Sequence, residues 1–211
     1  MTPFYPYACP LSFAISQKNR TCRAFFYDNV SEKFAIISVS NCQHLGVSYM
    51  ITEMGEYIVG AYLKIILDCD FVDYNARAIE GGKKGLGEFD VIGLRFEDKA
   101  AYICEVTTHI RGLLYKNNKS TVDRIKQKYA RQKEYAKDYL RGFPKRRYMF
   151  WSPFVHEGYV TDELKKIKGL QLVINKKYTK CVDELREQAR IMFNDTGNPF
   201  FRFLQILERL R

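Results

Sequence analysis

Short apolar runs of strand length recur along this chain. Residues 21–27 and 33–40 form one pair, separated by the polar segment DNVSE, and residues 89–96 and 100–110 form another, joined by EDK. Because short polar connections link antiparallel neighbours, each pair predicts a β-hairpin. Single strands are expected at residues 71–80, 146–155 and 170–176.

Helical patterns lie between these strands. Residues 51–67 are apolar almost all round and predict a buried helix. A long helix is expected from Thr121 to Leu140, with an apolar stripe at helical spacing, and Gly142 and Pro144 end it. The stripe consists of Val122, Ile125, Tyr129, Ala136 and Leu140. Residues 161–169 predict a short helix, and the C-terminal part predicts one or two more.

This order of elements predicts an α/β fold in which helices flank a mixed β-sheet. Residues 1–50 are expected to be an N-terminal extension with a β-hairpin, irregular and proline-containing over residues 1–20, and residues 51–211 the main domain. No apolar run approaches the roughly 20 residues of a membrane span, and we expect no signal peptide, because MTPFYPYACPLSF lacks a basic leader and is broken by three prolines. We expect a cytoplasmic protein whose six scattered cysteines are reduced.

Positive charge is concentrated in one part of the chain. The formal net charge is +10, and residues 116–147 hold twelve basic but only three acidic residues. One interpretation is a solvated helix surface, but such a surface usually mixes both signs, so we favour a phosphate-binding surface. The candidate nucleic-acid-binding residues are Lys116, Lys119, Arg124, Lys126, Arg131 and Lys133.

Three acidic residues lie in segments that are otherwise typical of a core. Asp90 begins a predicted strand, and Glu105 is in the middle of the next one. A lone buried carboxylate is costly, and two converging carboxylates repel each other unless a cation such as Mg²⁺ lies between them. Glu56 faces inward from the helix at residues 51–67, where a core partner is the alternative way to neutralise it.

These segments resemble a known superfamily. GEYIVGAYL (55–63), GEFDVIGL (87–94) and AYICEVTTH (101–109) are similar to the core of the PD-(D/E)XK, or restriction-endonuclease-like, nucleases. Members have a helix with a Glu, a strand beginning with a metal-binding Asp, a hairpin-linked strand carrying (Asp/Glu)-x-Lys, and then a basic helix. The resemblance covers roughly residues 51–160 and implies a restriction-endonuclease-like fold.

The resemblance also implies an activity, a Mg²⁺-dependent endonuclease that hydrolyses the phosphodiester bonds of DNA rather than RNA, with Mn²⁺ able to substitute. Glu56 matches the helix acid, and Asp90 and Glu105 match the metal ligands, with the Val106 carbonyl as a further ligand. Nucleases of this fold often dimerise, which leaves a homodimer open.

One position departs from the pattern, because Thr107 stands where the family has lysine. Three interpretations remain open. Lys128 reaches the site from the basic helix and acts as a catalytic residue with Thr107 beside it; His109 assists; or the site cleaves poorly or not at all. The last describes a catalytically degenerate nucleic-acid-binding module. An α/β protein of another kind, with accidental acids, is a further alternative.

The aromatic segment YMFWSPFVHEGY at residues 148–159 has two interpretations. Its rings are expected either to stack on nucleic-acid bases or to fill the core. We favour burial of Trp151 in a core strand.

Overall fold

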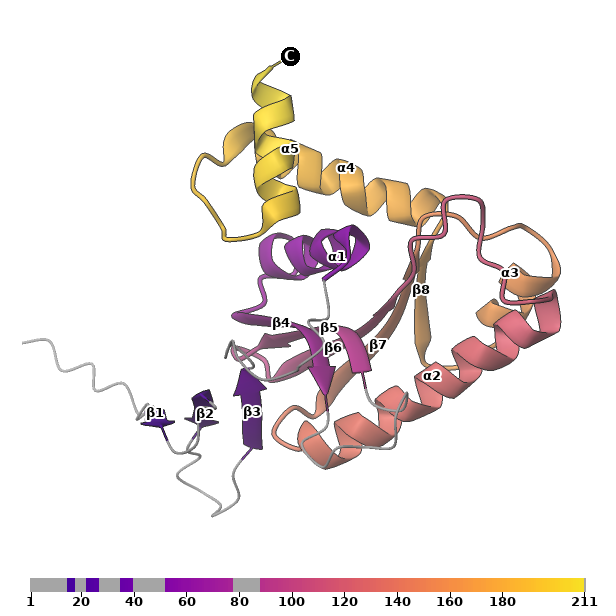
Figure 1. The fold of residues 1–211 in the computed structure, drawn as a ribbon, viewed down its shortest axis with the longest axis horizontal. Coiled ribbons are helices and arrows are strands. Elements are labelled where there is room, and N and C mark those ends of the chain that lie inside the picture. The colour runs from indigo at the N-terminus through magenta and orange to yellow at the C-terminus, as the bar shows by residue number, and fades with distance from the viewer. Residues whose placement is uncertain (1–14, 18–21, 27–34, 40–51, 78–87, 211) are drawn as a thin grey trace, which may run out of the picture. The chain divides into compact units, whose positions relative to one another are not determined.

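The structure is a computed structural model of the chain, and it describes residues 15–17, 22–26, 35–39, 52–77 and 88–210 (Figure 1). Contacts divide the chain into two units, Met1–Tyr49 and Met50–Arg211. The segment EGGKKGLGE at residues 80–88, whose glycine content predicts a loop, lies outside the described residues except for Glu88.

The N-terminal unit contains a three-stranded antiparallel sheet in the order β1-β2-β3. Its strands are Ile15–Gln17 (β1), Cys22–Phe26 (β2) and Ala35–Val39 (β3). The predicted hairpin is confirmed, because β2 pairs with β3 from Cys22 opposite Val39 to Phe26 opposite Ala35. The prediction of irregular structure is wrong for β1, whose three residues are too few to show a strand period.

The second unit is built on a five-stranded mixed sheet in the order β4-β5-β6-β7-β8. Strands β4 to β6 are antiparallel, and β6, β7 and β8 are parallel. Parallel neighbours need a crossover connection, which α2 and α3 supply. The strands are Phe71–Arg77 (β4), Glu88–Arg95 (β5), Ala100–Val106 (β6), Lys145–Ser152 (β7) and Leu170–Ile174 (β8).

Helices cover both faces of this sheet (Figure 1). On one face lie α1 (Met54–Ile65) and α4 (Lys176–Ile191), and α5 (Pro199–Arg209) packs on these two helices. On the other face lie α2 (Asn118–Tyr139) and α3 (Tyr159–Lys165). The predicted α/β class, with helices flanking a mixed sheet, is therefore confirmed.

The position of α1 explains its apolar character. Val59 and Leu63 pack toward the sheet, while Ala61 packs among residues of α4 and α5, so the helix is covered on two sides. Trp151 lies in the cluster with Val59 and is fully buried, which confirms the core interpretation for Trp151, whereas Phe154 and Tyr159 of the same segment are exposed.

The other face carries the second part of the core. Val122 and Ile125 of α2 pack with Phe150 of β7 and Leu164 of α3. This packing holds α2 across the sheet on the face from which Glu105 projects. Among the described residues, no helix combines the length and apolarity that a membrane span needs.

Candidate active site

The hairpin of β5 and β6 brings Asp90 to Glu105. The two strands pair from Arg95 opposite Ala100 as far as Val91 opposite Cys104, so the next step places Asp90 beside Glu105. There the Asp90 side chain replaces a backbone partner, because its Oδ2 accepts a hydrogen bond from the Val106 N–H at 2.6 Å. The Asp90 carboxylate is thus fixed at the point where the two strands part.

Glu105 is a buried carboxyl group, only 5% exposed. Burial above all, and then the neighbouring Asp90 charge, raise the pKa of Glu105 to about 8, although the Lys128 ammonium lowers it. When protonated, Glu105 donates a hydrogen bond to Asp90, which also raises its pKa. The pair therefore retains a proton near neutral pH, as two adjacent carboxylates do when no cation separates them.

Lys128 reaches this pair of carboxylates from the helix layer that packs on the same face of the sheet. It lies on α2, and its Nζ donates a hydrogen bond to Glu105 Oε1. Burial lowers the pKa of Lys128, but the charges of Glu105 and Asp90 outweigh burial, so the net shift is upward. The group remains an ammonium ion. The contact expected from the sequence is present, and its catalytic role stays a prediction.

Glu56 is the third acid, and α1 presents it in its first turn. Its Oε2 accepts the Glu53 N–H at 3.0 Å, as part of a capping box, and the Asn75 side-chain amide at 3.4 Å. Burial raises the pKa of Glu56 to about 7, and the Asp90 charge adds to this rise, while the two hydrogen bonds oppose it. Glu56 faces inward, as predicted, and interacts electrostatically with the Asp90 site.

Asn75 is a site residue that the sequence did not indicate. It has a φ of 54° and lies opposite Asp90, where the pairing between β4 and β5 is interrupted although the register is unchanged, since Tyr74 pairs with Val91 and Ala76 pairs with Phe89. Asn tolerates this left-handed backbone conformation better than most residues. The kink directs its amide toward Glu56 and Thr52. An Asn in the interior of a strand, where Asn is disfavoured, was the available signal.

Thr107 directly follows β6 and is buried. Its N–H donates to the Trp151 carbonyl at 3.0 Å, which continues the pairing with β7 by one step. Its hydroxyl is buried and has no hydrogen-bond partner in the part of the chain that the structure describes. Position 107 thus carries no cation, and within the described part of the chain Lys128 supplies the ammonium that contacts Glu105.

His109 does not share a strand face with Glu105. The strand was expected to continue to Ile110, but β6 ends at Val106, and His109 is exposed. Its ring contacts the Tyr115 ring edge-on, with centroids 5.6 Å apart. The alternating pattern extended beyond the strand because Thr107 and Thr108 favour extended backbone, while pairing with β7 stops one residue after Val106.

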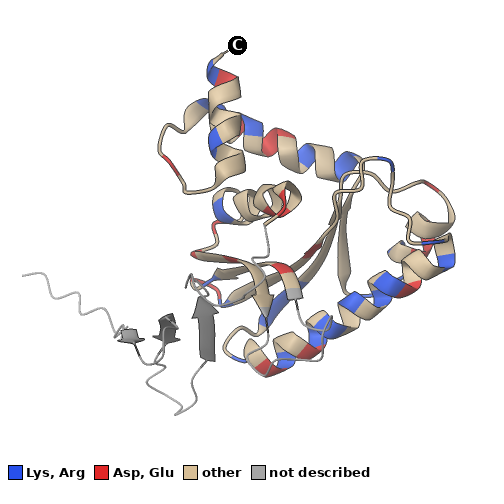
Figure 2. Ribbon diagram, viewed as in Figure 1, with Lys and Arg blue, Asp and Glu red and all other residues tan. Residues whose placement is uncertain are grey.

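The predicted nucleic-acid-binding residues are not gathered in one place. Lysines and arginines recur along the whole of α2 (Figure 2). Arg124 and Arg131 lie on the same edge of the helix as Lys128, at spacings of four and three residues. Lys119, Lys126 and Lys133 lie on the opposite edge, and Lys116 precedes the helix with a φ of 61°.

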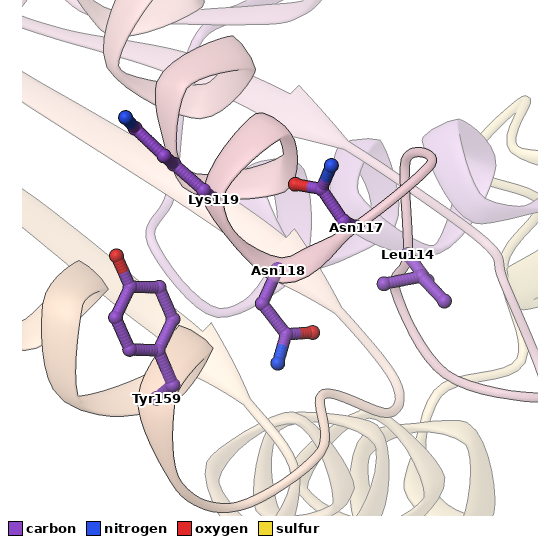
Figure 3. A pocket seen from close by; sticks show the side chains of 5 residues that line it. All are labelled: Leu114, Asn117, Asn118, Lys119 and Tyr159. Atoms are coloured by element: carbon purple, nitrogen blue, oxygen red, sulfur yellow. The ribbon is translucent and has the colours of Figure 1, made fainter.

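A shallow pocket of about 590 Å³ lies beside the first turn of α2 (Figure 3). Its lining includes Lys119 of α2 and Tyr159 of α3, and none of the three acids. The Asn117 side chain already caps the helix by accepting the Ser120 N–H at 2.8 Å. The pocket is therefore separate from the carboxylate site.

The carboxylate site suits a magnesium ion in its donor chemistry. Asp90 and Glu105 offer adjacent hard oxygen donors, and Mg²⁺ commonly binds through one or two carboxylates plus water and substrate phosphate. The neighbouring Asp90 charge helps to raise the pKa of Glu105, and a cation bound between the two carboxylates would reduce this repulsion. Within the described ranges, no group of three or more His, Cys, Asp or Glu side chains is close enough to hold a metal, so Glu56 stands apart from the pair.

Comparisons with models of protein families, with curated proteins and with solved structures found no match.

Proposed function

We propose that this chain is a metal-dependent nuclease that hydrolyses phosphodiester bonds of DNA on a restriction-endonuclease-like fold. The observation that carries the proposal is the contact of the Lys128 ammonium with Glu105, beside Asp90. The PD-(D/E)XK pattern combines two acids and a lysine, and here the lysine comes from α2 because Thr107 occupies its usual position.

In the proposed reaction the oxygen of water bonds to phosphorus, and the bond between phosphorus and one sugar oxygen breaks. The leaving oxygen takes a proton, and the water loses one. Negative charge builds up on the phosphoryl oxygens in the transition state. Fixed positive groups in the protein stabilise this charge and so accelerate the reaction.

Each residue has a distinct part in this proposal. Asp90 and Glu105, with the Val106 carbonyl, would hold Mg²⁺, which polarises phosphate and lowers the pKa of bound water. The Val106 N–H keeps Asp90 in place. Lys128 supplies a fixed positive charge beside Glu105, and Glu56, with its pKa of about 7, is suited to exchange a proton near neutral pH.

A second candidate is a nucleic-acid-binding module without catalysis. The observation that favours it is the same contact, because the Lys128 ammonium already compensates the Glu105 charge without any metal. In that protein the acids and the lysine would be a structural ion pair, and Thr107 would mark lost activity.

The deciding experiment measures cleavage of supercoiled, linear and single-stranded DNA and of RNA with Mg²⁺ or Mn²⁺. We expect metal-dependent cutting of DNA that Asp90→Ala abolishes. Cutting of RNA but not of DNA would support the proposed hydrolysis and identify RNA as the substrate. Absence of cutting on every substrate, with nucleic-acid binding intact in both proteins, would support the non-catalytic module instead.

A separate experiment tests the catalytic role of Lys128. Lys128→Met should lower the cleavage rate by about 100-fold or more, the loss typical of removing one fixed transition-state contact. Lys137→Met is the matched control, since Lys137 is an exposed lysine on the same helix. Thr107→Lys introduced into Lys128→Met should restore part of the rate, by returning an ammonium to the strand. Equal rates for Lys128→Met and wild type would remove Lys128 from the mechanism.

A further inference from the structure

The basic residues of α2 fall into two rows along the helix. Arg124, Lys128 and Arg131, here called the site edge, follow one another at spacings of four and three residues, so they lie in one line. The basic residues on the other side of the buried face of α2 are here called the outer edge. They are Lys119, Lys126, Lys133 and Lys137. Between the two rows lies the buried face of α2, which includes Val122, Ile125 and Ala136.

The site edge borders the carboxylate site. Lys128 lies between the buried face of α2 and the two arginines, so Arg124 and Arg131 lie on the side of Lys128 that is turned away from the core. The Arg124 guanidinium lies 4.3 Å from the centre of the Tyr115 ring, and Tyr115 is close enough to Lys128 to act on its pKa. Neither arginine forms an ion pair with a carboxylate of the described residues. Their charges are therefore available to a ligand.

The outer edge lies beside α3 and not beside the carboxylate site. Lys126 lies 3.9 Å from Glu163 of α3, and Lys133 lies over the Tyr129 ring at 4.7 Å. The Tyr129 hydroxyl in turn donates to the Lys168 carbonyl, just before β8. Because the buried face of α2 separates this edge from Glu105, a strand held by the outer edge would not reach the carboxylates.

Several of the remaining basic residues near α2 already have structural partners. The Arg146 guanidinium donates to the carbonyls of Leu140 and Phe143, which follow α2. Arg141 donates to the Lys137 carbonyl, and Lys145 pairs with Asp98. These contacts hold Arg141 and Arg146 against backbone carbonyls, and Asp98 offsets the charge of Lys145.

We propose that a nucleic-acid strand lies along the site edge of α2, with Arg124 and Arg131 each neutralising a phosphate on either side of the one at Lys128. This inference rests on the proposed function and specifies its substrate contact. Residues 124 and 131 are about 10 Å apart along the helix axis at 1.5 Å per residue. Over that length of duplex axis, one strand of DNA carries about three phosphates, at about 3.4 Å of axis each.

The test measures how binding depends on salt, by fluorescence anisotropy of a labelled DNA duplex and a labelled single strand. All variants are made in the Asp90→Ala background, so that the probe is not cut. Each neutralised phosphate contributes about 0.9 to the slope of log affinity against log salt for duplex DNA, and about 0.7 for a single strand. Arg124→Ala and Arg131→Ala should each reduce the magnitude of this slope by the contribution of one phosphate. For duplex DNA at 0.1 M salt, each should also lower the affinity by about 8-fold.

Matched variants separate charge from structure. Arg124→Lys and Arg131→Lys keep the charge and should keep the slope, and Lys137→Ala on the outer edge should leave it unchanged. A slope that falls with Lys126→Ala and Lys133→Ala, but not with the arginine variants, would overturn this inference and leave the nuclease proposal standing. Absence of binding to either probe would overturn both.

Discussion

The buried carboxyl group of Glu56 should make this protein less stable as the pH rises. The informative substitution is Glu56→Gln, which keeps the size of the side chain and an oxygen that can accept the Glu53 N–H and the Asn75 amide. It removes only the ability to ionise. Because Glu56 is 8% exposed, solvent screening of its charge is slight.

The magnitude follows from the shift in pKa between the unfolded and folded states. The pKa of Glu56 is raised from 4.5 to about 7, mainly by burial. Each pKa unit corresponds to 1.36 kcal/mol, so the shift amounts to about 3 kcal/mol. Between these two values the folded state binds a proton that the unfolded state has released. The free energy of unfolding therefore falls as pH rises from about 4.5 to about 7, and the loss is complete above that.

The assay is urea unfolding in metal-free, reducing buffer at a series of pH values from 5 to 8. The chain has a single tryptophan, Trp151, which is fully buried, so its fluorescence reports unfolding of the second unit. The difference between wild type and Glu56→Gln isolates Glu56, because both proteins retain Glu105. We expect this difference to change by about 3 kcal/mol across the series, in favour of the variant at high pH.

A matched control is Glu157→Gln, since Glu157 is exposed and should give a curve parallel to wild type. Parallel curves for Glu56→Gln as well would refute the reasoning, because the carboxyl group would then ionise equally easily in both states. A difference of the opposite sign would mean that Glu56 is held as a carboxylate by a cationic partner.

Two further substitutions test the packing around the site by the same urea assay. Gly60→Ala should destabilise the protein by about 1–3 kcal/mol, because its Cβ would overlap the Tyr74 hydroxyl. Gly142→Ala should have little effect, because the added Cβ would lie in open space. Equal effects of the two substitutions would contradict the close packing of α1 on Tyr74. Gln132→Leu should stabilise the protein by about 1 kcal/mol or more, because both amide atoms of Gln132 are buried without a partner among the described residues; a loss of stability would show that the amide is satisfied.

The meeting of Asp90 with Glu105 could be predicted because it follows from short-range rules. A short connection fixes the hairpin and brings the two acids near each other, but it does not fix the register. The predicted EDK turn would place Asp90 opposite Val106, and the observed four-residue connection, residues 96–99, places it beside Glu105. The kink at Asn75 could not be predicted in this way, since a positive φ leaves no periodic trace in the sequence. The Asn75 side chain also donates a hydrogen bond to Glu56, 19 residues away, which no local pattern reveals.

The orientation of α2 was only partly predictable, for a different reason. Its apolar stripe was expected to include Tyr129, whose hydroxyl instead reaches the Lys168 carbonyl at the margin of the interface. Gln132, which is polar, takes a fully buried position. This rotation brings the buried face closer to Lys128, and hydrophobicity alone cannot reveal it, because it is set by how the helix crosses the sheet.

The source of the ammonium has a consequence for how the site is assembled. A lysine at position 107 would be placed by β6 alone, two residues from Glu105. Lys128 is 23 residues from Glu105, and only the packing of Val122 and Ile125 against the sheet brings α2 to it. The positive charge at the carboxylates thus depends on the docking of α2. Substitutions that loosen this packing should impair the site while the strands that hold the acids remain paired.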